Sequence, residues 1–159
     1  MTNSKTLLNK LLDSPTKKAI LIGLFSFLGL IDASYLAAKH YNGTIPPCAI
    51  VKGCEVVTTS QYATIGLPAM EVGISVALLG AIYYLAVLII SIAIIDTKSD
   101  RLKKFLAGFS IIGLLASIWF ISLQLFVIKA LCLYCLVSAF SSAAIFLTAF
   151  FLKKDIVAR

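Results

Sequence analysis

Long uninterrupted apolar stretches dominate the pattern of this sequence. They cover residues 19–38, 74–95, 105–128 and 131–152, and most charged residues lie between them. Each stretch is close to the roughly 20 residues that a helix needs to cross the hydrocarbon core of a bilayer. The first is too long for the apolar core of a signal peptide, which has about 7 to 15 residues. The pattern predicts an all-α integral membrane protein, a bundle of four transmembrane helices.

The connections predict the arrangement of these helices. The link between the third and fourth stretches is very short, which favours an antiparallel hairpin within one compact bundle. We expect an N-terminal segment over residues 1–18, a four-helix membrane domain over 19–152 and a tail over 153–159. A long loop over residues 39–73 and a short one over 96–104 join the other helices.

Composition agrees with a membrane protein. The chain has 159 residues, of which 60% are hydrophobic and only 13% charged, and this argues against a soluble globular domain. The net charge is +7, but the basic residues are spread between apolar stretches rather than clustered for one folded face. We therefore expect no nucleic-acid partner.

The basic residues also predict orientation. Eleven of the 14 lie before the first stretch, between the second and third, or after the fourth, whereas Lys39, Lys52 and Lys129 lie in the other connections. Short loops rich in Lys and Arg stay on the cytoplasmic side of a membrane. We expect a multi-pass protein of the cell membrane with both termini in the cytoplasm and the 39–73 loop outside.

Cys132 and Cys135 form a C-x-x-C motif at the predicted outer start of the fourth helix. A spacing of three residues places both sulfur atoms on one helix face, where they can form a disulfide. The positive end of the helix dipole, with Lys129 nearby, lowers the pKa of such a thiol and favours the reactive thiolate. The alternative is a pair of ordinary buried cysteines.

A second pair, Cys48 and Cys54, lies in the predicted outer loop, on the same side as the C-x-x-C motif. Two pairs in an oxidising compartment are typical of a relay, in which a loop disulfide exchanges with a partner protein and then with a disulfide at the membrane surface. Gly53 would give the loop pair an adjustable backbone. The competing interpretation is a four-thiolate zinc site in a non-catalytic membrane scaffold.

The order of these motifs resembles the vitamin K epoxide reductase family, in its bacterial and archaeal branch without a fused thioredoxin-like domain. The matching residues span most of the chain. They are Cys48, the segment Cys54-Glu55-Val56-Val57-Thr58-Thr59-Ser60-Gln61-Tyr62, the segment Gly80-Ala81-Ile82-Tyr83-Tyr84, and Cys132-Leu133-Tyr134-Cys135-Leu136-Val137-Ser138-Ala139.

The resemblance implies a four-helix bundle around a quinone such as ubiquinone or menaquinone. It implies that Cys132 and Cys135 are the active-site pair and that Cys48 and Cys54 are the shuttle pair. Cys54 is then expected to exchange with Cys132, and Cys135 to face the quinone. Ser60 matches the family serine near the quinone head group.

Other family features bear on substrate and partner. Asp32 and Tyr35 match family positions in the first helix. Animal enzymes have a tyrosine four residues after the second active-site cysteine, where this chain has Ala139, so the resemblance leaves open whether vitamin K epoxide is a substrate. Some relatives carry a fused thioredoxin-like domain, whereas this chain stops at Arg159. We therefore expect a separate thioredoxin-like or DsbA-like redox partner, together with membrane lipid and the quinone pool.

A quinone ring needs an apolar slot with one or two hydrogen-bond donors. Tyr134, beside the thiols, and Trp119, near the middle of its helix, are candidate quinone contacts, together with Phe120 and Phe126. Asp32 is the acidic residue well inside an apolar stretch, where an ionisable group is a functional candidate by default. We expect it to relay protons or to anchor the outer loop.

These features together predict a quinone-dependent membrane thiol–disulfide oxidoreductase that supports disulfide formation in exported proteins. A DsbB-type quinone-linked oxidase is an alternative within the same chemistry. That type carries its C-x-x-C motif in the first external loop, whereas the motif here opens the last helix.

Overall fold

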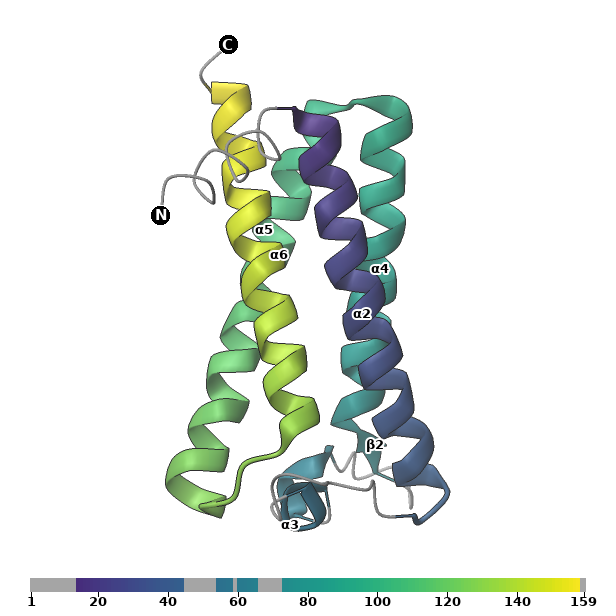
Figure 1. Cartoon of the computed structure of the whole chain (residues 1–159), viewed down its shortest axis with the longest axis vertical. Coiled ribbons are helices and arrows are strands. Elements are labelled where there is room, and N and C mark those ends of the chain that lie inside the picture. The colour runs from purple at the N-terminus through teal and green to yellow at the C-terminus, as the bar shows by residue number, and fades with distance from the viewer. Residues whose placement is uncertain (1–13, 45–53, 59, 66–72, 158–159) are drawn as a thin grey trace, which may run out of the picture.

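The computed structural model describes residues 14–44, 54–58, 60–65 and 73–157 of the chain. Long helices dominate it (Figure 1). They are α2 (Pro15–Tyr41), α4 (Val76–Thr97), α5 (Asp100–Ser122), which continues as the π-helix η2 (Leu123–Ile128), and α6 (Leu133–Val157). Between α2 and α4 lie α3 (Cys54–Thr58), η1 (Gln61–Ala63), and the antiparallel strands β1 (Thr64–Ile65) and β2 (Ile74–Ser75).

Four helical segments in the described residues are long and apolar enough to cross a membrane, namely Pro15–Tyr41, Val76–Thr97, Asp100–Ile128 and Leu133–Lys154. This confirms the predicted four-helix membrane bundle. Large apolar side chains cover its outside, where they match a lipid environment rather than water. Examples are Leu24, Phe27, Leu115, Ile118, Phe126 and Phe140.

The observed helices extend past several of the predicted apolar stretches. α2 begins at Pro15 and ends at Tyr41, and α5 begins at Asp100, because backbone hydrogen bonding continues beyond the apolar core. Proline suits the first position of a helix, since no partner inside the helix awaits its missing N–H group. The fourth helix instead begins later than its predicted stretch, which started at residue 131. It begins at Leu133, so Cys132 precedes it instead of lying inside it.

Close packing holds α2 against α4 and α6, and α5 against α6, whereas α4 and α5 contact each other less. The predicted hairpin of the third and fourth membrane helices is thus present. Gly29 allows α2 to approach α4 closely, because a Cβ atom there would lie 2.5 Å from the ring of Tyr84. Ser91 of α4 donates a hydrogen bond to the carbonyl oxygen of Ala19 in α2. Small residues at such contacts let membrane helices pack closely.

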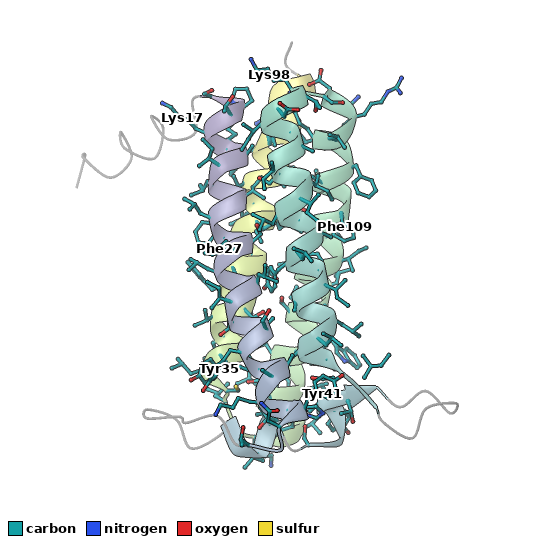
Figure 2. All side chains as sticks on the ribbon, turned by 90° about the vertical axis from the view of Figure 1, so that its right-hand side faces the viewer. Lys17, Phe27, Tyr35, Tyr41, Lys98 and Phe109 are labelled. Carbon is teal, nitrogen blue, oxygen red and sulfur yellow. The ribbon has the colours of Figure 1, made fainter. Side chains whose placement is uncertain are left out.

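The two ends of the bundle differ in character. Lys17 and Lys98 lie at one end, and Tyr35 and Tyr41 at the other (Figure 2). α3 and β2 lie at the end opposite the start of α2 (Figure 1). At this end the Tyr41 hydroxyl lies 3.4 Å from the backbone nitrogen of Ser75, from which it accepts a hydrogen bond. This contact links the end of α2 to the start of α4.

Candidate functional site

A cavity of about 440 Å³ lies inside the bundle, toward the end that carries α3. Its wall is mostly apolar, with contributions from every membrane helix and from α3 and η1. Small-molecule sites usually have this character, an apolar enclosure of a few hundred Å³ with a small number of polar groups. The polar or reactive side chains in its lining that concern us are those of Asp32, Ser60, Tyr83, Tyr84, Gln124 and Cys135.

The two thiols of the C-x-x-C motif occupy different surroundings. Cys132 is fully buried and stands immediately before α6, where its carbonyl oxygen accepts the N–H of Leu136 at 3.1 Å. Cys135 lies in the first turn of α6 and lines the cavity. Both are free thiols in this structure. The arrangement presents Cys135 to a ligand in the cavity and keeps Cys132 behind it.

Hydrogen bonds make the Cys132 thiol more acidic than an ordinary cysteine thiol. The Cys135 thiol donates a hydrogen bond to the Cys132 sulfur, and this bond is the main reason why the Cys132 pKa is lowered to about 7. Burial opposes the shift, and the backbone N–H groups of Cys135 and Tyr134 add weaker hydrogen bonds that favour it. A residue at the N-cap of a helix typically accepts from those N–H groups. The lowered pKa populates a thiolate near neutral pH. Its main cause is the second cysteine, whereas the sequence pattern pointed to the helix dipole and Lys129.

Two buried oxygen atoms at the cavity have no hydrogen-bond partner within the described part of the chain. They are Oδ2 of Asp32 and the hydroxyl of Tyr83. Buried polar groups are nearly always paired, so an unpaired one calls for an explanation such as a bound molecule. A quinone fits, because its ring suits the apolar wall and its carbonyl oxygens accept hydrogen bonds of the kind that a tyrosine hydroxyl donates.

Tyr84, the neighbour of Tyr83, is fully engaged. Its hydroxyl lies 2.6 Å from the carbonyl oxygen of Ser138, to which it donates, and 2.8 Å and 2.9 Å from the hydroxyls of Ser138 and Ser142. These bonds join α4 to the first turns of α6, just after Cys135. Tyr84 therefore holds the wall of the cavity, whereas the buried hydroxyl of Tyr83, a second residue of the lining, has no hydrogen-bond partner among the described residues.

The segment between α2 and α4 closes one end of the cavity. Ser60 lines the cavity, and its hydroxyl donates a hydrogen bond of 2.8 Å to the carbonyl oxygen of Val57. α3, which begins at Cys54, contacts η2 next to the C-x-x-C motif. Of Cys54 only this position in the backbone is described, and Cys48 lies outside the described residues.

The structure separates the aromatic candidates from one another. Phe120 lines the cavity. Trp119 is 64% exposed and Phe126 is 78% exposed, so both face the surroundings of the bundle. Tyr134 packs against Tyr35, with ring centroids 5.4 Å apart, and neither ring belongs to the described lining of the cavity. Adjacent helix positions point about 100° apart, which separates Trp119 from Phe120.

Gln124 also belongs to the site, although it was not among the site residues predicted from the sequence. It is only 2% exposed, lines the cavity, and accepts the backbone N–H of Cys132 at 2.9 Å through its side-chain oxygen. An amide near the end of an otherwise apolar stretch was the available signal, since polar side chains inside membranes are costly and usually functional. Tyr83 belongs to a segment that matches the family, but its residue type gave no separate signal, because aromatic residues are common in membrane helices.

The fold and the site define a class, a four-helix membrane protein with a dithiol beside an apolar cavity. A model of the vitamin K epoxide reductase family matches residues 20–150. The chain belongs to this family, as the motifs predicted. No curated protein matches the chain. Family membership implies a membrane oxidoreductase with thiol–disulfide and quinone-linked activity in general.

Proposed function

We propose that this protein is a quinone-dependent thiol–disulfide oxidoreductase that draws electrons from a separate thioredoxin-like or DsbA-like protein. The observation that carries the proposal is the position of Cys135, which lines an apolar cavity together with Asp32 and Ser60. A bound quinone supplies an acceptor for two electrons and two protons. The chain supplies the dithiol, the enclosure and the polar groups.

In the proposed reaction, the partner's dithiol first reduces the Cys48–Cys54 disulfide. Cys54 then reduces the Cys132–Cys135 disulfide by thiol–disulfide exchange, and the loop disulfide forms again. Finally the Cys132 and Cys135 thiols lose two electrons and two protons as their S–S bond forms, and the quinone becomes a quinol. The net result is one new disulfide in the partner for each quinone reduced.

The cavity residues have distinct tasks in this proposal. Cys135 faces the ring, and the Tyr83 hydroxyl donates a hydrogen bond to a quinone carbonyl oxygen. Asp32 lies close enough to Cys132 to affect its ionisation, so its carboxyl group is suited to take up a thiol proton. Ser60 helps close the outer end. Apolar residues exclude water, which protects the thiolate from competing reactions.

The test is the anaerobic absorbance change of a quinone mixed with a small dithiol and the detergent-purified protein. We expect reduction by the unaltered protein and none by Cys135→Ser. Val137→Ser introduces the same residue two positions away, on an exposed part of α6, and should retain activity. Equal activity of Cys135→Ser and the unaltered protein would contradict the proposal. One tightly bound zinc ion per chain would favour the scaffold instead.

The loop pair has its own test, which compares two electron donors. Cys54→Ser should abolish quinone reduction by a thioredoxin-like protein and leave reduction by a small membrane-permeable dithiol largely intact. Cys48→Ser should behave in the same way. Equal losses with both donors would assign the loop pair a structural role.

We also propose that both termini face the cytoplasm and that the thiols lie at the outer face of the cell membrane. The basic residues support this orientation, as do Lys17 and Lys98 at the end of the bundle opposite Tyr41 (Figure 2). Two exposed threonines provide a matched test, Thr44 at the thiol end and Thr97 at the other. In a chain whose other cysteines are serines, an impermeant maleimide added to intact cells should label Thr44→Cys and spare Thr97→Cys.

A further inference from the structure

The backbone of Gln124 controls the chain reversal before the C-x-x-C motif. Its carbonyl oxygen accepts the N–H of Lys129 and, at 3.1 Å, the N–H of Ala130. Lys129 has the left-handed conformation, with φ of 53°, that ends the helix. The π-helical turn around Gln124 differs from the α5 helix that precedes it, and such wide turns recur at functional sites.

The side chain of Gln124 contacts both members of the motif. Its oxygen accepts the backbone N–H of Cys132 at 2.9 Å. This N–H has no acceptor inside α6, because the first four N–H groups of a helix lack one. Since a backbone N–H can only donate, the atom that faces it must be the amide oxygen. The NH₂ group is then available to donate to the sulfur of Cys135, which lines the same cavity as Gln124.

The two contacts differ in their dependence on the redox state. The bond to the Cys132 backbone is the same in the dithiol and the disulfide. The bond to Cys135 is not, because a thiolate sulfur is a far stronger acceptor than a neutral thiol or a disulfide sulfur. Hydrogen bonds to charged groups contribute about 1.5–3 kcal/mol, more than bonds between neutral groups. The Gln124 amide can therefore bind the Cys135 sulfur more strongly once that sulfur has lost its proton.

We infer that Gln124 is a further catalytic residue, which anchors the C-x-x-C motif through Cys132 and donates a hydrogen bond to the reacting sulfur of Cys135. This role deepens the proposed function and rests on it for its place in the reaction. Gln124 itself neither gains nor loses a proton. The two thiols lose two electrons and two protons to the quinone as their disulfide forms.

The test measures Cys135 alone and needs no quinone, so it is independent of the proposed reaction. Cys48, Cys54 and Cys132 are replaced by serine, and alkylation of the remaining thiol by iodoacetamide is followed by intact mass between pH 6 and 11. The midpoint of the rate against pH reports how well the thiolate is stabilised. The plateau rate at high pH reports only access to the sulfur.

Gln124→Met keeps the length of the side chain and removes both polar atoms. We expect its midpoint to rise by about one to two pH units, which is a ten- to hundredfold slower reaction at a fixed pH below the midpoint, with the plateau unchanged. Ser122→Ala, which removes an exposed hydroxyl from the same helix end, should leave both quantities unchanged. An unchanged midpoint in Gln124→Met, whatever the plateau, would overturn the inference.

A second variant keeps the test decisive where Gln124→Met fails to fold. Gln124→Glu retains an oxygen for the Cys132 N–H and places a carboxyl group where the NH₂ group was. Ionised beside the sulfur, this group opposes the thiolate, so the midpoint must rise above that of the unaltered residue. A midpoint equal to that with Gln124 would show that position 124 does not contact the Cys135 sulfur and would overturn the inference.

Discussion

The hydroxyl of Tyr84 in α4 donates a hydrogen bond of 2.6 Å to the backbone carbonyl oxygen of Ser138 in α6. Ser138 lies three residues after Cys135, so the bond fixes the reactive turn of α6 against α4. α4 has few contacts with α5, so its position beside the cavity depends more on other contacts, such as this bond to α6.

Tyr84→Phe should lower the stability of the bundle more than Tyr83→Phe. The first change removes a hydroxyl with partners on Ser138 and Ser142, and hydrogen bonds between membrane helices contribute about 0.6 kcal/mol on average, up to about 1.7. The Tyr83 hydroxyl has no partner among the described residues. Thermal unfolding in detergent separates the two variants. An equal loss of Tm in both would contradict the assignment.

Tyr83→Phe should instead weaken binding of the quinone. Loss of one hydrogen bond to a neutral carbonyl corresponds to about 0.5–1.5 kcal/mol, so the KM for quinone should rise by a factor of about 2 to 13 with little change in kcat. Steady-state quinone reduction with a small dithiol measures both constants. An unchanged KM would leave the free hydroxyl of Tyr83 without a role in binding.

Gly113→Ala should disturb the cavity, and Gly108→Ala on the same helix should not. A Cβ atom at Gly113 would overlap the hydroxyl and ring of Tyr83, which is stacked on Phe109 with centroids 5.2 Å apart. Overpacking of this kind costs about 1–3 kcal/mol. A Cβ atom at Gly108 meets nothing within 4 Å. We expect a lower Tm and a higher quinone KM for the first variant alone, and similar behaviour of both would argue against this packing.

Asp32→Asn should slow turnover without weakening the fold. The amide has the shape of the carboxyl group but cannot accept a proton, and loss of a general base typically costs about 10²- to 10⁴-fold in rate. Oδ2 of Asp32 has no hydrogen-bond partner in the described residues, so little native bonding is lost. The measurements are kcat for quinone reduction and the Tm. A normal kcat with a lower Tm would make Asp32 a structural anchor.

The reactivity of Cys132 should depend on pH with a midpoint near 7. A lowered thiol pKa means that the thiolate is populated above about pH 7 and that alkylation slows as the pH falls through this value. With Cys48 and Cys54 as serines, the rate at Cys132 is measured by peptide mass spectrometry. Cys135→Ala removes the main hydrogen bond to the sulfur and should move the midpoint upward. Cys135→Ser retains a donor and should move it less.

The neighbours Trp119 and Phe120 provide a test of the cavity wall. Phe120 lines the cavity, and Trp119 is exposed on the outside of α5. Phe120→Ala should raise the quinone KM, whereas Trp119→Ala should leave it near its original value. The reverse result would indicate that the quinone binds against the face of α5 that carries Trp119.

The sequence determined the number of membrane helices and the order of the chemical motifs. The thickness of a bilayer fixes the length of an apolar helix, so four such stretches could be recognised without knowledge of their packing. The spacing of Cys132 and Cys135 is similarly local, because one helical turn relates the two residues. The motifs around both cysteine pairs were sufficient to predict the family, which the match over residues 20–150 confirms.

Only the tertiary structure decided which side chains meet in the cavity. The membrane-facing and inward faces of such helices are similarly apolar, so the pattern does not reveal which way Trp119, Phe120 or Tyr83 points. Gln124 meets Cys132 only because the π-helical turn and the left-handed Lys129 return the chain to α6. The rotation of each helix about its axis is set by packing against its neighbours, and that rotation, rather than local sequence, assembled the site.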